Sequence, residues 1–144
     1  MSVFVVDASV VVKWFVPEIH SEKARGLLAL PHEYVAPELL FAEAANTIWK
    51  KVRRKELSAE EGQPLVADIG RVRGAVETVT CRTLAEDAYV LAHATGRTVY
   101  DAMYVVLAVR LNTRLITADD RLEAALRNVP ALADHIQLVQ TFEP

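Results

Sequence analysis

The sequence contains little cysteine, no long apolar run and no excess of positive charge. Its single cysteine, Cys81, cannot form a disulfide within the chain and leaves no cysteine-based metal site, so we expect a reducing, cytoplasmic location. No uncharged apolar stretch approaches the ~20 residues that span a bilayer. The first apolar run meets Asp7 too early for a secretory signal. We therefore expect no association with a membrane.

The formal net charge of −3 argues against a dedicated, high-affinity nucleic-acid binder. It is compatible with a nuclease, because a bound metal supplies positive charge at the phosphate that is cleaved. Local basic clusters can steer a polyanion, although cations in the last turn of a helix are also favoured by the helix dipole. The main cluster is Lys50, Lys51, Arg53, Arg54 and Lys55, with Arg71, Arg73 and Arg82 as further candidates.

Length and composition predict one globular domain over residues 1–144, since 52% of the residues are hydrophobic and 24% are charged. Short β-type runs alternate with longer helical stretches, which predicts an α/β fold: three α/β/α layers around a mostly parallel sheet. Strands are expected at residues 3–6, 34–36, 75–80, 115–117 and 136–139. Helices are expected at residues 8–15, 22–30, 37–54, 58–74, 83–96, 101–112 and 119–126.

Local signals predict where several of these helices begin. Ser58 and Glu61 have the spacing of a capping box, and Thr83 and Glu86 repeat that spacing. Pro37 is expected in the first turn of its helix, where the missing N–H has no intrahelical partner to lose.

Three aspartates lie where apolar elements begin or end. Asp7 ends the first apolar run, and Asp119 follows the run at residues 115–117. Asp101 opens the most apolar helical stretch and is expected to cap it. Ligands of parallel sheets bind beyond the carboxyl ends of the strands, so Asp7 and Asp119 are expected at one edge. Taken singly, an aspartate between a strand and a helix is most often just a helix N-cap.

Glu43 is predicted to lie on a helix, on a polar face with Asn46, Thr47 and Lys50. Such a stripe is normally solvated. If the fold gathers Glu43 with the three aspartates, their mutual repulsion raises their pKa values unless a cation intervenes. Hard oxygen donors suit Mg²⁺ or Mn²⁺, and such an ion with open coordination positions can hydrolyse phosphodiesters.

Four segments together resemble the signature blocks of PIN-domain ribonucleases, most closely the VapC-type toxins of bacterial and archaeal toxin–antitoxin systems. In the order of the family, they are VVDASV (residues 5–10), PELLFAEAAN (37–46), YDAMYVVLA (100–108) and LITAD (115–119). The similarity extends over nearly the whole chain, and the four blocks are specific only in combination.

The resemblance implies a catalytic and metal-binding quartet around Mg²⁺ or Mn²⁺, with Asp7 and Asp101 as the most direct ligands. It also implies that Ser9 and Thr117 orient these carboxylates and that Asn46 occupies a polar position near them. Asp120 introduces an ambiguity, because it can replace Asp119 as a ligand. It can also simply add negative charge to the first turn of a helix, which the helix dipole favours. The implied quartet is Asp7, Glu43, Asp101 and Asp119.

The resemblance further implies an endoribonuclease that acts on an RNA substrate, forms a homodimer and is inhibited by a cognate VapB-like antitoxin. An amphipathic antitoxin segment needs an apolar groove. Large apolar residues near helix ends are candidates for that groove, although such residues more often pack in the core. They are Trp14, Phe15, Ile48 and Trp49.

Two other functions fit a small α/β protein with clustered acids. A phosphoacceptor signalling domain needs a lysine at the end of a strand, whereas Lys13 and Lys50 are predicted within helices. A non-catalytic module that keeps the acids for docking a metal or a partner is the second alternative. A phosphatase of the HAD type fits less well, because Asp7-Ala8-Ser9 lacks the second aspartate of that motif.

Overall fold

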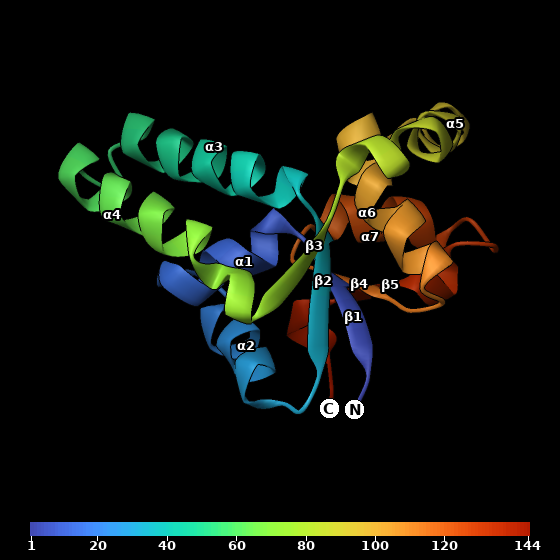
Figure 1. Ribbon diagram of the computed structural model, residues 1–144, viewed down its shortest axis with the longest axis horizontal. Coiled ribbons are helices and arrows are strands. Elements are labelled where there is room, and N and C mark those ends of the chain that lie inside the picture. The colour runs from blue at the N-terminus through green and yellow to red at the C-terminus, as the bar shows by residue number, and fades with distance from the viewer.

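A parallel sheet at the centre of the protein has the strand order β3-β2-β1-β4-β5 (Figure 1). The computed structural model describes residues 1–144, apart from the side chain of Arg73. The strands are β1 (Val3–Val6), β2 (Glu33–Pro37), β3 (Val76–Val79), β4 (Leu115–Thr117) and β5 (Ile136–Leu138). Strands β1 and β4 are almost continuously apolar because both faces of the sheet are covered. Val5, Val6 and Ile116 accordingly have no exposed surface.

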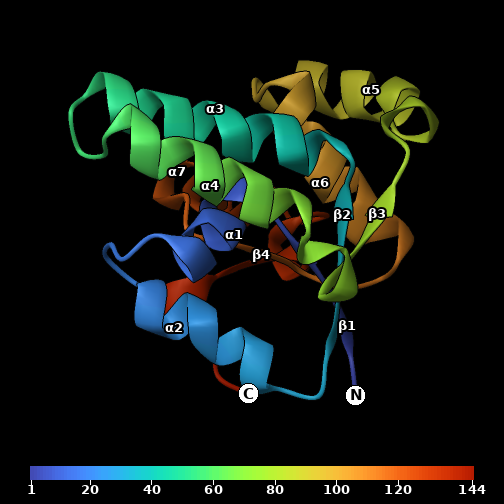
Figure 2. The ribbon, with the colours of Figure 1, turned by 60° about the vertical axis from the view of Figure 1, so that its left-hand side comes forward.

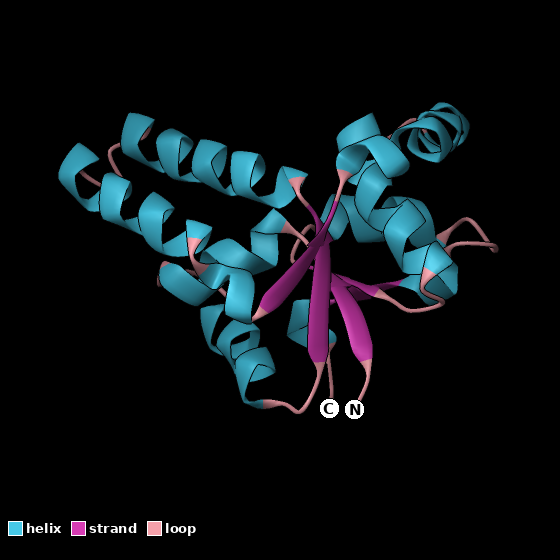
Figure 3. Cartoon of the chain, in the orientation of Figure 1, coloured by secondary structure: helices cyan, strands magenta, loops and turns pink.

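Helices cover both faces of the sheet, as Figures 2 and 3 show. Helices α1 to α4 lie on one face, and α5 to α7 lie on the other. This arrangement confirms the predicted three-layer α/β/α fold. The helices are α1 (Ala8–Phe15), α2 (Ser21–Gly26), α3 (Leu39–Arg53), α4 (Ala59–Gly70), α5 (Ala85–Thr95), α6 (Val99–Arg110) and α7 (Asp120–Arg127).

The order of the strands reverses between β1 and β4. From β1 the chain moves outward through β2 to β3, and then returns to place β4 on the other side of β1. The register pairs Val5 of β1 with Val35 of β2 and with Leu115 of β4. The carboxyl ends of β1 and β4 therefore meet at a topological switch point, where parallel sheets bind ligands.

Helix starts differ from the sequence prediction in three places. Thr98, not Asp101, caps α6, and its hydroxyl accepts a hydrogen bond from the Asp101 N–H at 3.1 Å. Pro37 ends β2 instead of opening α3, since a strand end does not need its missing N–H. Thr83 belongs to a short 3-10 helix, and α5 begins at Ala85 without a side-chain cap.

Other local predictions hold. The capping box at Ser58 and Glu61 is present, with both reciprocal hydrogen bonds. Two predicted helices are shorter than expected, because each ends in a 3-10 segment: Leu27–Ala29 after α2 and Val72–Gly74 after α4. Among the helices described, none combines the length and apolarity needed to cross a lipid bilayer.

Candidate active site

One pocket of about 210 Å³ is lined by all four acidic side chains that the sequence singles out. Asp7 follows β1, and Asp119 lies just beyond β4. Asp101 and Glu43 come from α6 and α3, which belong to opposite layers. The switch point therefore gathers acids that are widely separated in the sequence. The other lining residues are Ala8, Ser9, Asn46, Thr47, Lys50 and Tyr104.

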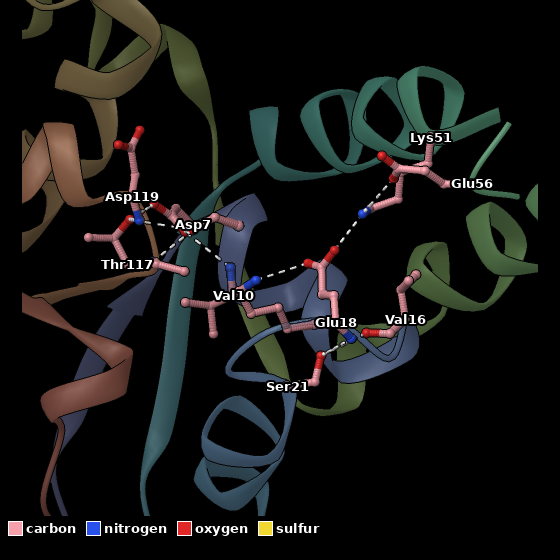
Figure 4. Close-up of polar contacts among 12 residues, drawn as sticks. Asp7, Val10, Val16, Glu18, Ser21, Lys51, Glu56, Thr117 and Asp119 are labelled. Atoms are coloured by element: carbon pink, nitrogen blue, oxygen red, sulfur yellow. Dashed lines mark hydrogen bonds and ion pairs between the residues drawn. The ribbon is translucent and has the colours of Figure 1, made fainter. Parts of the chain in front are cut away.

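Asp7 is the most buried of the four acids, with 8% of its surface exposed. Its carboxylate caps α1 by accepting a hydrogen bond from the Val10 N–H at 3.3 Å (Figure 4). The hydroxyls of Ser9 and Thr117 also donate to it. Burial raises the pKa of Asp7 to about 6, although these three hydrogen bonds lower it; the nearby charge of Glu43 raises it further.

Ser9 and Thr117 do more than contact Asp7. The Ser9 hydroxyl accepts from the Ala118 N–H at 2.9 Å, and the Thr117 hydroxyl accepts from the Asp119 N–H at 3.1 Å. Both hydroxyls therefore tie the end of β4 to the start of α1. These contacts are those expected of groups that orient carboxylates.

Glu43 points from α3 toward α6, where the Tyr104 hydroxyl donates a hydrogen bond to Glu43 Oε1 at 2.6 Å. Burial and the charge of Asp101 raise the pKa of Glu43, and the hydrogen bond from Tyr104 lowers it. Burial, together with the adjacent Glu43 charge, holds the pKa of Tyr104 far above its ordinary value. The Tyr104 hydroxyl therefore keeps its proton and can donate it in the hydrogen bond to Glu43.

Asp101 lies in the first turn of α6, where Arg97 Nη2 donates to Asp101 Oδ2 at 3.0 Å. Asp119 caps α7, and its Oδ1 accepts from the N–H groups of Arg121 and Leu122 at 3.0 and 3.1 Å. In each of these acids a protein donor holds one carboxylate oxygen.

Asp119 and its neighbour Asp120 occupy different positions relative to the pocket. Asp119 lines the pocket, whereas the exposed Asp120 accepts a hydrogen bond from Gln140 Nε2 at 3.0 Å. Asn46 also lines the pocket, three residues beyond Glu43 on the same face of α3. The roles of these residues as ligands or orienting groups remain predictions.

The donor set suits a hard divalent cation, because four carboxylates surround one small hollow and burial has already raised the pKa of Asp7 and Glu43. In the conformation described, no three acidic, histidine or cysteine side chains among the described residues converge closely enough to form a ready-made metal cluster. The fit therefore rests on the chemistry of the lining, and side-chain movements are needed to bring the oxygens onto one ion.

The predicted basic cluster is only partly available to a polyanion. Lys50 is exposed at the acidic pocket. Lys51 is instead bound to Glu18 and lies 3.4 Å from Glu56 (Figure 4). The Arg53 guanidinium lies 5.3 Å from the centre of the Trp49 ring. Arg54, Lys55 and Arg82 are exposed, Arg71 pairs with Asp68, and the Arg73 side chain lies outside the described part of the chain.

The proposed apolar groove is mostly core. Trp14 and Ile48 are 7% and 1% exposed, so neither is available to a partner. Phe15 packs against the core, and only Trp49 is largely exposed, at 54%. Core packing was therefore the correct interpretation for most of this set.

Two residues of the site were missed from the sequence, Tyr104 and Arg97. Both are recognisable in retrospect by helical spacing, because they lie three residues after and four residues before Asp101. The polar stripe on α3 was a weaker indication of the site than the aspartates at the strand ends, because such a stripe is normally solvated. It faces the pocket instead of open solvent, because α6 lies opposite Glu43.

Comparison with known proteins identifies the family. Residues 4–127 match the PIN domain. This chain belongs to the PIN-domain family. The chain is 35% identical over 118 residues to "Ribonuclease VapC3" of Pyrobaculum aerophilum. This alignment covers 82% of the chain and 90% of that protein. The chain is 34% identical over 105 residues to "Ribonuclease VapC1" of Mycobacterium tuberculosis, with 73% and 74% covered. The resemblance seen in the sequence is confirmed.

Solved structures share the fold of this PIN domain. PAE2754 from Pyrobaculum aerophilum superposes with a TM-score of 0.66 at 22% identity, covering 96% of this chain and 84% of the other. VapC20 of Mycobacterium tuberculosis, a sarcin-ricin loop cleaving toxin, superposes with a TM-score of 0.67 at 18% identity, covering 85% of this chain and 94% of the other. VapBC2 from Rickettsia felis, bound to a DNA fragment from its promoter, gives 0.62 at 12% identity, with 94% and 98% covered.

Proposed function

We propose that this protein is a VapC-type endoribonuclease toxin that hydrolyses RNA phosphodiester bonds with the help of Mg²⁺ or Mn²⁺. The observation that carries the proposal is the pocket at the switch point, lined by four carboxylates from four different elements. Relatives named as VapC ribonucleases, with sequence identities of 34–35%, support the choice of RNA over other phosphodiesters.

Asp7 and Asp101 are the residues that we expect to hold the ion most directly, with Glu43 and Asp119 completing its surroundings. When bound, the ion supplies Lewis-acid charge stabilisation at the phosphate and lowers the pKa of water. Protein donors already fix one oxygen of Glu43, Asp101 and Asp119. Their second oxygens therefore remain available with little further loss of conformational freedom.

Glu43 is suited to accept the proton of the attacking water, because burial and the Asp101 charge raise its pKa above its ordinary value and make it a stronger base. Asp119 is the second acceptor that the sequence suggests. No nucleophilic serine is needed, since water is the proposed nucleophile. The Ser9 hydroxyl is in any case engaged with Asp7 and with the Ala118 N–H. Lys50 is the cation that lines the pocket and is placed to meet a phosphate of the bound RNA.

A cognate VapB-like antitoxin is the proposed inhibitor, and the VapBC2 complex among the structural neighbours supports such a partner. We also propose a homodimer. Its support is an apolar hollow lined by α5, α6 and the segment at residues 129–132 after α7, where Val90 and Val109 are 63% and 40% exposed. Sedimentation of the purified chain, with and without its antitoxin, tests both assemblies.

The function is tested by incubating a panel of structured RNAs with the purified protein in Mg²⁺, Mn²⁺ or a chelator. We expect metal-dependent cleavage by the wild type and none by Asp101→Asn. Asp120→Asn is the matched control, because it neutralises an exposed acid outside the pocket lining. Full activity of Asp101→Asn removes that residue from the proposal. A metal-loaded, partner-free wild type that cleaves no RNA favours the non-catalytic alternative.

A further inference from the structure

Tyr104 connects the two layers of the protein at the acidic pocket. Its ring is almost completely buried in the core, with 2% of the residue exposed, and its hydroxyl reaches the pocket lining. There it donates to Glu43 Oε1 at 2.6 Å, across 61 residues of sequence. A buried ring with a single polar tip is a rigid support for a hydrogen bond.

The hydrogen bond removes much of the freedom of Glu43. A glutamate on a helix can place its carboxylate in many rotamers, and fixing it costs side-chain entropy. Thr47 is bonded back to the Glu43 carbonyl and not to its carboxylate, so the Tyr104 hydroxyl is the protein donor that we identify for this acid. With Oε1 held, Oε2 is the oxygen left to face the pocket.

The same helix also presents Asp101. Tyr104 lies three residues after it, so both side chains project from one side of α6 toward the pocket. Helix α6 therefore sets the position of one acid directly and of a second acid through a hydrogen bond. A neutral hydroxyl achieves this without adding a positive charge, unlike the Arg97 guanidinium that pairs with Asp101.

We propose that Tyr104 is a positioning residue that aims Glu43 for binding of the divalent ion and for the cleavage step. This inference rests on the proposed function, because it assigns Tyr104 a role through an acid of that site. It predicts that the hydroxyl, and not the ring, is what the site requires.

The test compares Tyr104→Phe with the wild type, since this change deletes one oxygen and retains the buried ring. We expect Mn²⁺ affinity, measured by calorimetry without RNA, to fall about 10-fold, the lower end of the loss seen when an outer-shell partner is removed. We expect kcat to fall by a similar factor while KM for RNA is unchanged. Circular dichroism in chelator should show the same folded spectrum.

Tyr100→Phe is the matched control, because Tyr100 lies on the same helix but is 59% exposed and outside the pocket lining. It should leave Mn²⁺ affinity and kcat unchanged. The decisive comparison is made in the Glu43→Gln background. If Tyr104 acts through Glu43, then Tyr104→Phe has little further effect once Glu43 is neutralised.

Unchanged Mn²⁺ affinity and kcat in Tyr104→Phe overturn the inference. So do losses that simply add in the double variant, since Tyr104 then acts independently of Glu43. If Tyr104→Phe is not folded, the hydroxyl is structural and the inference is also overturned. A Glu43→Gln variant with wild-type affinity and cleavage has a different meaning, because it contradicts the proposed function itself.

Discussion

Thr117 donates a hydrogen bond to Asp7 Oδ2, although the two residues are 110 positions apart in the sequence. The contact exists because β1 and β4 are parallel neighbours in the sheet, so their carboxyl ends lie side by side. Thr117 is fully buried, and its hydroxyl also accepts from the Asp119 N–H. A single hydroxyl therefore connects two of the four acids of the pocket.

Thr117→Val, which keeps the shape and removes the hydroxyl, should lower the free energy of unfolding by about 1–3 kcal/mol at pH 7, because a buried carboxylate loses a donor. Urea unfolding in chelator measures this loss. Thr83→Val is the control, since Thr83 is exposed and its hydroxyl donates to the backbone carbonyl of Thr80. Equal stability of the two variants at pH 7 contradicts the prediction.

The metal-free protein should lose stability as the pH rises from about 4 to 6. In this window the folded protein retains a proton on Asp7, whose pKa is about 6, while the unfolded chain releases it near 3.8. The folded state binds more protons, so the free energy of unfolding falls as the pH rises, by roughly 3 kcal/mol from this group. Asp7→Asn removes this contribution.

The measurement is urea unfolding of the wild type and of Asp7→Asn at several pH values in chelator. Only the difference between the two proteins is compared, because other groups titrate in the same range. A difference that does not change between pH 4 and pH 7 rules out a raised pKa for Asp7.

Glu18 should contribute pH dependence of the opposite sign. Burial opposes its ionisation, but hydrogen bonds and charges from Lys51 and Lys13 lower its pKa below the ordinary value of 4.5. Its contribution is therefore present above pH 4.5 and is lost as the pH falls through the lowered value. Lys13 is itself buried, and its Nζ lies 3.0 Å from Glu18 Oε1.

Glu18→Gln should accordingly destabilise the protein by about 1–2 kcal/mol at pH 7 and less at pH 3. Glu60→Gln provides the control, because Glu60 is an exposed acid of α4. Thermal unfolding at the two pH values is sufficient. A loss of the same size at both pH values indicates that the charge of Glu18 is not involved.

Mg²⁺ should stabilise the wild type more at pH 7.5 than at pH 5, because the ion binds deprotonated carboxylates and competes with the protons on Asp7 and Glu43. At 100 times the dissociation constant, the stabilisation is about 2.7 kcal/mol. The shift in unfolding temperature on adding Mg²⁺ reports it. Asp101→Asn should show little shift at either pH, whereas a wild-type shift in that variant contradicts a site at this pocket.

Much of the fold was predictable from the sequence because its signals are local. The apolar runs at residues 3–6 and 115–117 match β1 and β4 in both bounds. Helix starts were less predictable where two residues compete for one role. Thr98 and Asp101 both have cap chemistry, and the first turn of α6 uses the threonine hydroxyl. Pro37 is compatible with a strand end as well as with a first helical turn, and pairing with β3 extends the strand to it.

The candidate site was predictable to the extent that strand ends define it. Asp7 and Asp119 follow adjacent parallel strands, so their proximity follows from topology. The partner of Glu43 did not follow, because the hydrogen bond from Tyr104 depends on how α3 and α6 pack from opposite layers. The sequence likewise could not show that Asp119 lines the pocket while Asp120 does not. Asp120 is bound by Gln140, and no local pattern indicates that contact.

The central claim is that the four acids together hold a divalent ion. Its most direct test is anomalous diffraction from crystals of the wild-type protein soaked in Mn²⁺, with crystals of Asp101→Asn soaked in parallel. We predict one strong anomalous peak in the pocket between Asp7 and Asp101 in the wild type, absent or much weaker in the variant. A pocket without a peak at saturating Mn²⁺, or an equal peak in Asp101→Asn, would contradict the account.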